Sequence, residues 1–256
     1  MSTPPEHHPA EEFTAAFNQL DQAIRKQTGM FDRDRSSFMA VFSSLTQQHR
    51  WLERHVSQVR LIANLRNVIA HAPRSPGHYI ATPEPIAIDY VRDLHRAITR
   101  PPTVDPRFTA SGGVSVVGTK DSIEAVLELV RERDFTHVPV VAEECVQGVL
   151  TATGVLRWLG QAAATESLID FADVKVDEVL AAEDPSVESF RLIGRLTPVP
   201  DALYTFAENP ALQALVITHS GAQREKPIGI ITTWDAMKGL GTDDSLGVRL
   251  DGALAP

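Results

Sequence analysis

Two related stretches of sequence decide the fold. Residues 229–235 are Gly-Ile-Ile-Thr-Thr-Trp-Asp, and residues 148–154, which lie 81 positions earlier, are Gly-Val-Leu-Thr-Ala-Thr-Gly. Each stretch begins with glycine and a short apolar run that ends at a threonine, Thr151 or Thr232. A short apolar run bounded by glycine and polar residues is typical of a buried β-strand. We therefore expect two strand-to-helix turns of the same kind.

The residues around the first stretch predict a small unit of strands and helices. Apolar side chains recur at helical spacing in residues 122–133, and β-branched residues dominate the segments on either side. The expected strands are residues 115–117, 137–141 and 146–150, and the expected helices are residues 122–133 and 153–161. This order of elements is β-α-β-β-α.

The same unit recurs later in the chain. Ala202 lies 77 residues after Ala125, and the four residues by which this spacing differs from 81 fall in the turn 219–227. Each copy alone would leave one sheet face unburied, and packing the two faces together buries both. We expect a pseudo-symmetric pair with a cleft between its copies, the first at residues 111–165 and the second at 166–245.

The first hundred residues predict a different, all-α domain. Helical stripes are expected from about residue 11 to 28, from about residue 35 to 70 with a break near Asn64 or Arg66, and at residues 86–99. The fold class is thus multidomain α and α+β, with a helical bundle at residues 11–100 before the tandem pair. We expect a disordered lead-in at residues 1–10, a stiff proline-rich linker at 101–110 and a tail at 246–256.

Composition excludes several classes of protein. The 256 residues carry a net charge of −9 and are 43% hydrophobic, which is ordinary for a globular protein and unlike disordered or collagen-like chains. One cysteine, Cys145, excludes an internal disulfide and fits a reducing compartment. The start of the chain is unlike a signal peptide, and no apolar run approaches the roughly 20 residues that span a bilayer. We expect a cytoplasmic protein without membrane contact.

The turn at residues 229–235 has a chemistry that suits a nucleotide. A threonine at the start of a helix places its hydroxyl beside free backbone N–H groups, where a phosphate binds favourably. Asp235, one helical turn later, can accept hydrogen bonds from both hydroxyls of a ribose. The alternative is that Thr232 and Asp235 only cap the last helix.

These motifs closely resemble the CBS domain, a β-α-β-β-α unit found in tandem pairs called Bateman modules. The resemblance rests on residues 121–125, 135–141 and 148–151 of the first copy, and on residues 195–198, 214–217 and 229–235 of the second. It implies that Thr232 contacts phosphate and Asp235 contacts ribose, with adenine between the segments 138–139 and 215–216.

The first copy departs from the family pattern. Thr151 corresponds to Thr232, but Gly154 stands where the ribose carboxylate should be, so this site is expected to be weak or altered. His137 is a further candidate ligand contact, and its alternative is a partly buried strand histidine. The ligands implied by the family are AMP, ADP, ATP, S-adenosylmethionine and cyclic di-AMP, and the sequence does not choose among them.

A shorter motif in the helical region resembles HEPN domains, which are helical dimerising domains that often act as metal-independent ribonucleases. It consists of Arg66, Asn67 and His71. His71 would transfer a proton near neutral pH, Arg66 would stabilise phosphorane charge, and Asn67 would orient one of them. Alternatively, Arg66 and Asn67 tie the bundle to the next loop and His71 caps its helix.

The sequence predicts a regulatory protein that senses an adenine-containing nucleotide and passes the signal to a helical homodimer. One alternative is a nucleotide-regulated ribonuclease, with RNA bound by the helical domain, and another is a dimerisation scaffold without ligand. No required cofactor and no DNA are expected. The histidines lack carboxylate partners at metal-ligand spacing, so no metal site is expected either.

Overall fold

The computed structural model describes residues 8–30, 36–71, 79–109, 114–133, 135–165, 168–183 and 188–241. The expected lead-in as far as residue 7, residue 110 of the expected linker and the expected tail at 246–256 lie outside these ranges. Contacts divide the chain into two compact units. The first unit comprises residues 1–102, 199–204 and 239–256, and the second comprises residues 103–198 and 205–238.

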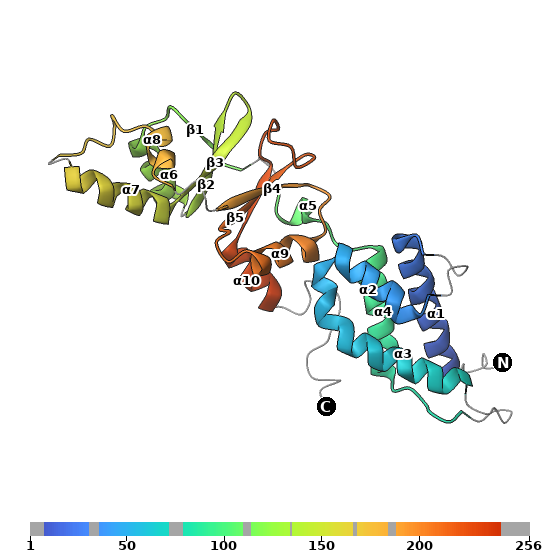
Figure 1. Ribbon diagram of the computed structural model, residues 1–256. Coiled ribbons are helices and arrows are strands. Elements are labelled where there is room, and N and C mark those ends of the chain that lie inside the picture. The colour runs from blue at the N-terminus through green and yellow to red at the C-terminus, as the bar shows by residue number, and fades with distance from the viewer. Residues whose placement is uncertain are drawn as a thin grey trace, which may run out of the picture. The chain divides into compact units, whose positions relative to one another are not determined.

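Within the described part of residues 8–102, the first unit is built on four α-helices (Figure 1). They are α1 (Pro9–Thr28), α2 (Phe38–Gln48), α3 (Val56–His71) and α4 (Pro85–Thr99), with a 3-10 helix at Arg50–His55 between α2 and α3. The apolar stripe expected on α1 is buried in a core that all four helices share. Full burial of each large apolar side chain at these positions stabilises the fold by about 1.5 to 3 kcal/mol.

The long helix expected at residues 35–70 is interrupted, and not at the expected place. It is divided into α2 and α3 at His49, whose backbone angles, φ −128° and ψ 83°, are not helical. The 3-10 turn that follows buries Trp51, Leu52 and His55. Continuous helical periodicity in the sequence hides this change of direction, because the buried positions continue on both sides of it. No break occurs near Asn64 or Arg66, which both lie within α3.

The second unit contains the β-α-β-β-α order twice. We call residues 117–165 the first repeat: β1 (Val117–Gly118), α6 (Ile123–Arg133), β2 (His137–Ala142), β3 (Cys145–Thr151) and α7 (Ala152–Thr165). We call residues 190–241 the second repeat: β4 (Phe190–Gly194), α9 (Val199–Glu208), β5 (Ala214–Thr218), β6 (Gly229–Thr232) and α10 (Thr233–Gly241). The ends of α9 and α10 that fall within residues 199–204 and 239–241 are counted with the first unit.

Both repeats form three-stranded sheets with one pattern. The strand orders are β1-β2-β3 and β4-β5-β6, and in each sheet the first pair is parallel and the second antiparallel. The register places His137 opposite Thr151 in the first sheet and Ala214 opposite Thr232 in the second. Equivalent threonines therefore end the third strand of each sheet, and a helix begins at the next residue.

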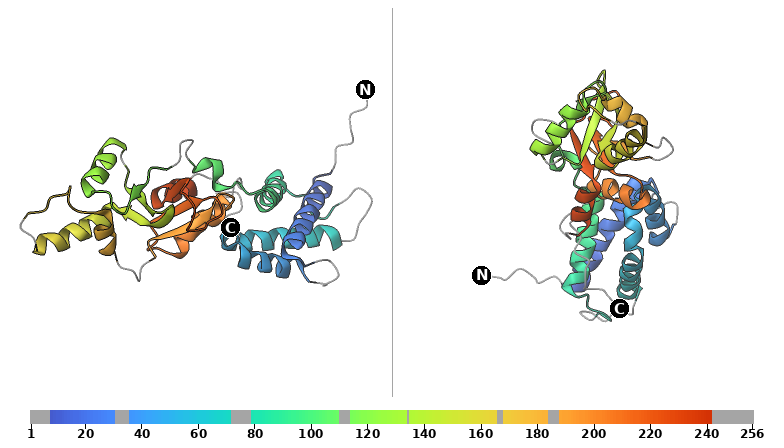
Figure 2. Two further views of the ribbon diagram at one scale, coloured as in Figure 1. Left: turned by 90° about the horizontal axis from the view of Figure 1, so that it is seen from above. Right: turned by 90° about the vertical axis from the view of Figure 1, so that its left-hand side faces the viewer.

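The two sheets pack against each other within the second unit (Figure 2). Val146 and Val149 of β3 form one buried cluster with Ala214 and Val216 of β5. The edge of the contact is fixed by hydrogen bonds in both directions, because the Val146 N–H donates to the Gln223 carbonyl at 3.0 Å and the Gln223 side chain donates to the Val146 carbonyl at 3.1 Å.

Two further elements of the second unit were not expected from the sequence. Helix α8 (Val176–Ala181) follows the first repeat and packs Val176 and Val179 into its core. Helix α5 (Val104–Arg107) lies in the stretch expected as a linker. From Thr103 to Thr109 this stretch is hydrogen-bonded to the second repeat. Val104 N–H donates to the Thr197 carbonyl at 3.0 Å, and Thr109 forms a β-bridge with Gly229.

None of the helices in the described ranges is both long and apolar enough to cross a membrane.

Candidate functional site

The turn from β6 to α10 brings Thr232 and Asp235 together, as the motif predicts. Thr232 precedes the first residue of α10, and its N–H and hydroxyl both donate to Asp235 Oδ2, at 2.9 and 2.7 Å. The Asp235 N–H in turn donates to the Thr232 hydroxyl at 3.4 Å. This reciprocal arrangement is a capping box, in which each side chain satisfies a backbone donor at the helix start. The capping role considered for this pair is therefore present.

Capping leaves this pair able to contact a ligand. Thr232 and Asp235 are both partly exposed. Both bonds from Thr232 end at Oδ2, and among the described residues none donates to Oδ1. The turn thus presents a hydroxyl, a carboxylate oxygen and the positive end of α10 to the same region. These are the groups required for a phosphate and a neighbouring diol.

The imidazole of His137 is within electrostatic range of the same carboxylate. His137 lies at the start of β2 in the first repeat, and its Nδ1 is 2.9 Å from the Thr136 hydroxyl. Burial lowers the pKa of His137, and the negative charge of Asp235 raises it in part. A residue of the first repeat is therefore electrostatically coupled to the turn of the second.

The equivalent turn of the first repeat has only half of the capping box. The Gly154 N–H donates to the Thr151 hydroxyl at 2.9 Å, but Gly154 has no side chain to return the bond. Thr151 is 4% exposed and is counted among the buried polar residues. The two threonines that align in sequence therefore differ in access to solvent.

The residues expected to hold an adenine ring are buried in the cores. Val138, Leu215 and Val216 have at most 2% of their surface exposed. The structure thus shows no open apolar surface at these three positions. Lys120, in the turn between β1 and α6, is ion-paired with Asp177.

In the helical unit, the three residues of the second motif lie on α3 and face different ways. Arg66 is directed toward the first helix, with its guanidinium carbon 5.8 Å from the centre of the Phe17 ring and its Nε buried without a hydrogen-bond partner. Asn67 and His71 are exposed and, being four residues apart, share one helix face. Within one chain the structure brings Asn67 and His71 together and leaves Arg66 apart from them.

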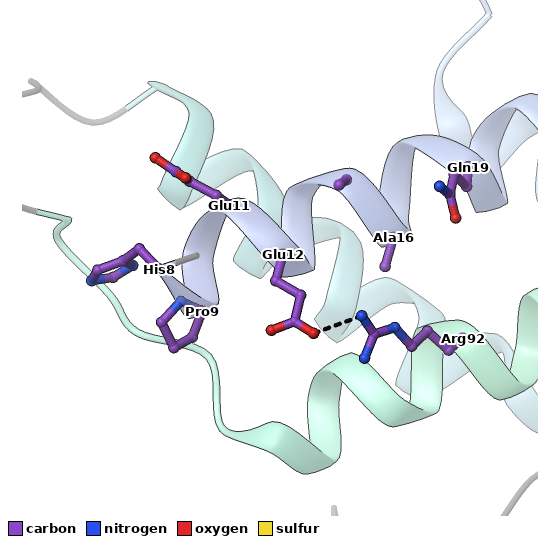
Figure 3. A pocket seen from close by; sticks show the side chains of 8 residues that line it. His8, Pro9, Glu11, Glu12, Ala16, Gln19 and Arg92 are labelled. Atoms are coloured by element: carbon purple, nitrogen blue, oxygen red, sulfur yellow. Dashed lines mark hydrogen bonds and ion pairs between the residues drawn. The ribbon is translucent and has the colours of Figure 1, made fainter. Parts of the chain in front are cut away.

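A cavity of about 990 Å³ lies between α1 and α4, and none of the three motif residues lines it (Figure 3). Its lining includes His8, Glu12, Ala16 and Arg92, and the Arg92 guanidinium donates to Glu12 Oε1 across it at 2.6 Å. Glu12 and Arg92 therefore have a structural role, because their ion pair joins the two helices.

Sequence comparison identifies a family for one part of the chain. The family model of the CBS domain matches residues 91–161, which include the strands of the first repeat and the turn at Thr151. The chain contains a CBS domain. The matched range ends before α8 and the second repeat. Thr232 and Asp235 lie outside the matched CBS domain.

Comparison with solved structures finds further CBS-domain proteins at low similarity. CBSX2, solved in complex with AMP, is 21% identical, with 54% of this chain and 95% of that chain covered at a TM-score of 0.40. CbpB, solved in complex with c-di-AMP, is 17% identical, with 57% and 86% covered at 0.40. Protein MJ1225 from Methanocaldococcus jannaschii is 19% identical, with 65% and 57% covered at 0.43. A search of curated proteins finds no match to this chain.

Sequence reasoning missed one residue that belongs beside the CBS-domain turn. Glu183 follows α8, and its carboxylate lies against Gly154. No motif marks it, because it comes from a segment between the two repeats, 29 positions away from Gly154 along the chain. The absence of a side chain at Gly154 is the signal that could have prompted a search for a substitute.

Proposed function

We propose that the chain is a regulatory protein in which the second repeat is a second CBS copy, and that this copy binds an adenine-containing nucleotide at the Thr232–Asp235 turn. The observation that carries the proposal is the state of this turn. Its hydroxyl and carboxylate are adjacent, partly exposed and placed at the first turn of α10. Phosphate near the helix start and ribose at Asp235 Oδ1 use these groups without disturbing the fold.

The binding of an anion here also has an electrostatic rationale. The free N–H groups at the start of α10 carry partial positive charge, which favours a phosphate. Asp235 is already engaged through Oδ2, so its charge is partly offset by two donors. His137 provides a further donor or acceptor beside the ribose position. The ligand class therefore combines a phosphate with a vicinal diol, as in AMP, ADP and ATP. Cyclic di-AMP offers a phosphate with the 2′-hydroxyl alone, because its 3′-oxygens are esterified, and S-adenosylmethionine offers the diol with another polar group in place of the phosphate.

The segment that leads out of the helical unit would carry the signal of ligand binding from the second repeat to that unit. Asp105 accepts a hydrogen bond from Thr109 at 2.6 Å and another from Arg195 Nε at 2.8 Å, and both bonds lower the pKa of Asp105. A ligand that favours one arrangement of the second repeat would displace this segment with it. The helical domain is then the responding part, and we propose that it acts as a homodimer in the cytoplasm.

The alternative of a ribonuclease needs Arg66 beside His71. The orientation of Arg66 toward Phe17 gives that alternative no support within one chain. It therefore stays a prediction, and loss of RNA cleavage in a His71→Ala variant is the result that it requires.

A thermal-shift panel tests the proposed function. Purified protein is heated with AMP, ADP, ATP, S-adenosylmethionine or cyclic di-AMP, beside the variants Asp235→Ala and Asp173→Ala. A ligand at 100 times its Kd stabilises by about 2.7 kcal/mol, which raises the Tm of a protein of this size by about 5 to 11 °C. We expect a rise in the wild type and in Asp173→Ala, whose exposed carboxylate lies outside the turn, and its loss in Asp235→Ala. No rise with any compound would favour a scaffold without ligand.

A further inference from the structure

The carboxylate of Glu183 occupies the space that a side chain at position 154 would use. A Cβ atom placed on Gly154 would lie 1.9 Å from Glu183 Oε1, and Thr151 Oγ1 lies 3.3 Å from the same point. In the second repeat the side chain that points from this position is Asp235. The first repeat thus has a carboxylate at its strand-to-helix turn, but one that reaches it from the segment after α8.

Glu183 is held in this position by the helix that begins at the turn. Arg157, three residues after Gly154 on α7, donates from Nη1 to Glu183 Oε2 at 2.9 Å. The side chain of Glu183 is 20% exposed and that of Arg157 is 45% exposed. One oxygen is therefore anchored by a charge-assisted bond, and the other is directed at the turn.

Glu183 lies beside the less accessible of the two threonines. Thr151 is 4% exposed in the first repeat, whereas Thr232 is partly exposed in the second. In both turns the threonine hydroxyl accepts the N–H of the third helical residue. The two turns differ in the carboxylate at this position, which is that of Glu183 beside Gly154 in the first repeat and that of Asp235 itself in the second. A phosphate that approached Thr151 would meet both the bulk and the negative charge of Glu183.

We infer that Glu183 closes the first nucleotide site, so that each chain binds one nucleotide, at the Thr232–Asp235 turn. This inference rests on the proposed function and adds to it the stoichiometry and the residue that sets it. Glu183 is the blocking residue, and Arg157 is a positioning residue that acts through it.

Isothermal titration calorimetry of the full chain with AMP, repeated with ATP and cyclic di-AMP, tests the inference. We expect one site per chain in the wild type and two in Glu183→Ala. Arg157→Ala should also gain the second site, because it releases the blocking carboxylate. Glu188→Ala is the matched control. It removes a carboxylate that pairs with Arg191 at 2.7 Å in the same unit, and should keep one site.

Combination with Asp235→Ala distinguishes the inference from the proposed function. In the Glu183→Ala background this second change should remove one of the two sites and leave the site at Thr151. One site in both wild type and Glu183→Ala would overturn the inference alone, as would two sites in the wild type. No binding by any variant would overturn the proposed function and the inference with it. Nucleotide could bind only to proteins that carry Glu183→Ala, with either Asp or Ala at position 235. That result would support the closure by Glu183 and would overturn the site at Thr232.

Discussion

The turns at Thr151 and Thr232 share a hydrogen bond at the start of the helix and differ in the side chains around it. Each threonine ends the third strand of a sheet and accepts the N–H of the third residue in the next helix. In the second repeat that residue is Asp235, which completes the capping box from within the turn. In the first repeat it is Gly154, and Glu183 enters from outside. The two turns thus keep one pattern of strand, threonine and helix, and they differ in the residue that supplies the carboxylate beside it.

Gly148 and Gly229, which begin the two stretches, differ in how much space surrounds them. A Cβ on Gly229 would lie 2.2 Å from the backbone carbonyl oxygen of Phe108, whereas a Cβ on Gly148 would lie 3.2 Å from Cδ2 of Leu180. A backbone atom within a bridged segment cannot move aside alone, but the end of a leucine side chain can. The second repeat therefore requires glycine more strictly than the first.

The largest expected effect is on the free energy of unfolding, and it differs between the two glycines. Gly229→Ala should destabilise the protein by about 3 kcal/mol, because the segment at Phe108 must separate from β6, whereas Gly148→Ala should cost about 1 kcal/mol as Leu180 adjusts. Urea denaturation of both variants, followed by fluorescence and circular dichroism, measures the difference. Equal losses would mean that residues 103–109 do not hold their place against β6.

Removal of the threonine hydroxyls comes next in size. Thr151→Val should cost about 1 to 2 kcal/mol, since it leaves the buried Gly154 N–H without an acceptor. Thr232→Val should cost about 0.5 kcal/mol, because its turn is partly exposed and water can replace the lost bonds. Nucleotide binding should show the reverse order, with a loss in Thr232→Val and none in Thr151→Val. A loss of binding in both variants would contradict the closure of the first turn.

A carboxylate introduced at position 154 should change the stability of the protein less. Gly154→Asp should destabilise by about 1 kcal/mol, because the new side chain expels Glu183 and separates it from Arg157. Gly160→Asp is the matched control on the same helix, where a Cβ meets no atom within 4 Å, and it should leave the Tm nearly unchanged. The double variant Gly154→Asp with Glu183→Ala should recover the lost stability. If it does not, the clash is with another group.

The smallest expected effect is on the titration of His137. Asp235 raises the pKa of His137 against the lowering effect of burial, so Asp235→Asn should lower that pKa further. Glu183→Gln should leave it unchanged. Because the pKa of His137 in the folded protein lies below its unfolded value, stability falls as the pH decreases below about 6.5, and Asp235→Asn should steepen this loss. NMR titration of the imidazole resonances provides the measurement, and a shift only in Glu183→Gln would reverse the assignment of the two turns.

The strands and turns of the second unit followed from local sequence. Apolar runs predicted β2 and β3 to within about a residue, because both the strand and its end are encoded by neighbouring residues. The strand expected at residues 115–117 is instead the two-residue β1 at Val117–Gly118. The proximity of Thr232 and Asp235 followed for the same reason, since three residues of helix bring them together. The family model matches only the first of the two repeats.

The missed features depend on contacts between distant residues. Glu183 reaches Gly154 by way of α8, and nothing in the segment around it resembles a site. The bend at His49 follows from the burial of Trp51 and His55, which periodicity alone does not reveal. Arg66 illustrates the same limit, because its spacing from His71 suggested a joint role while packing directs it toward Phe17.

The attachment of residues 103–109 to β6 has a consequence for protein engineering. Prolines at positions 101, 102 and 106 make this stretch look like a spacer at which domains can be exchanged. Its bonds to Thr197, Arg195 and Gly229 instead make it part of the second repeat. A chimaera that joins another input or output domain to this module should therefore place its junction before Thr103, and one that starts at residue 111 would leave the face of Gly229 uncovered.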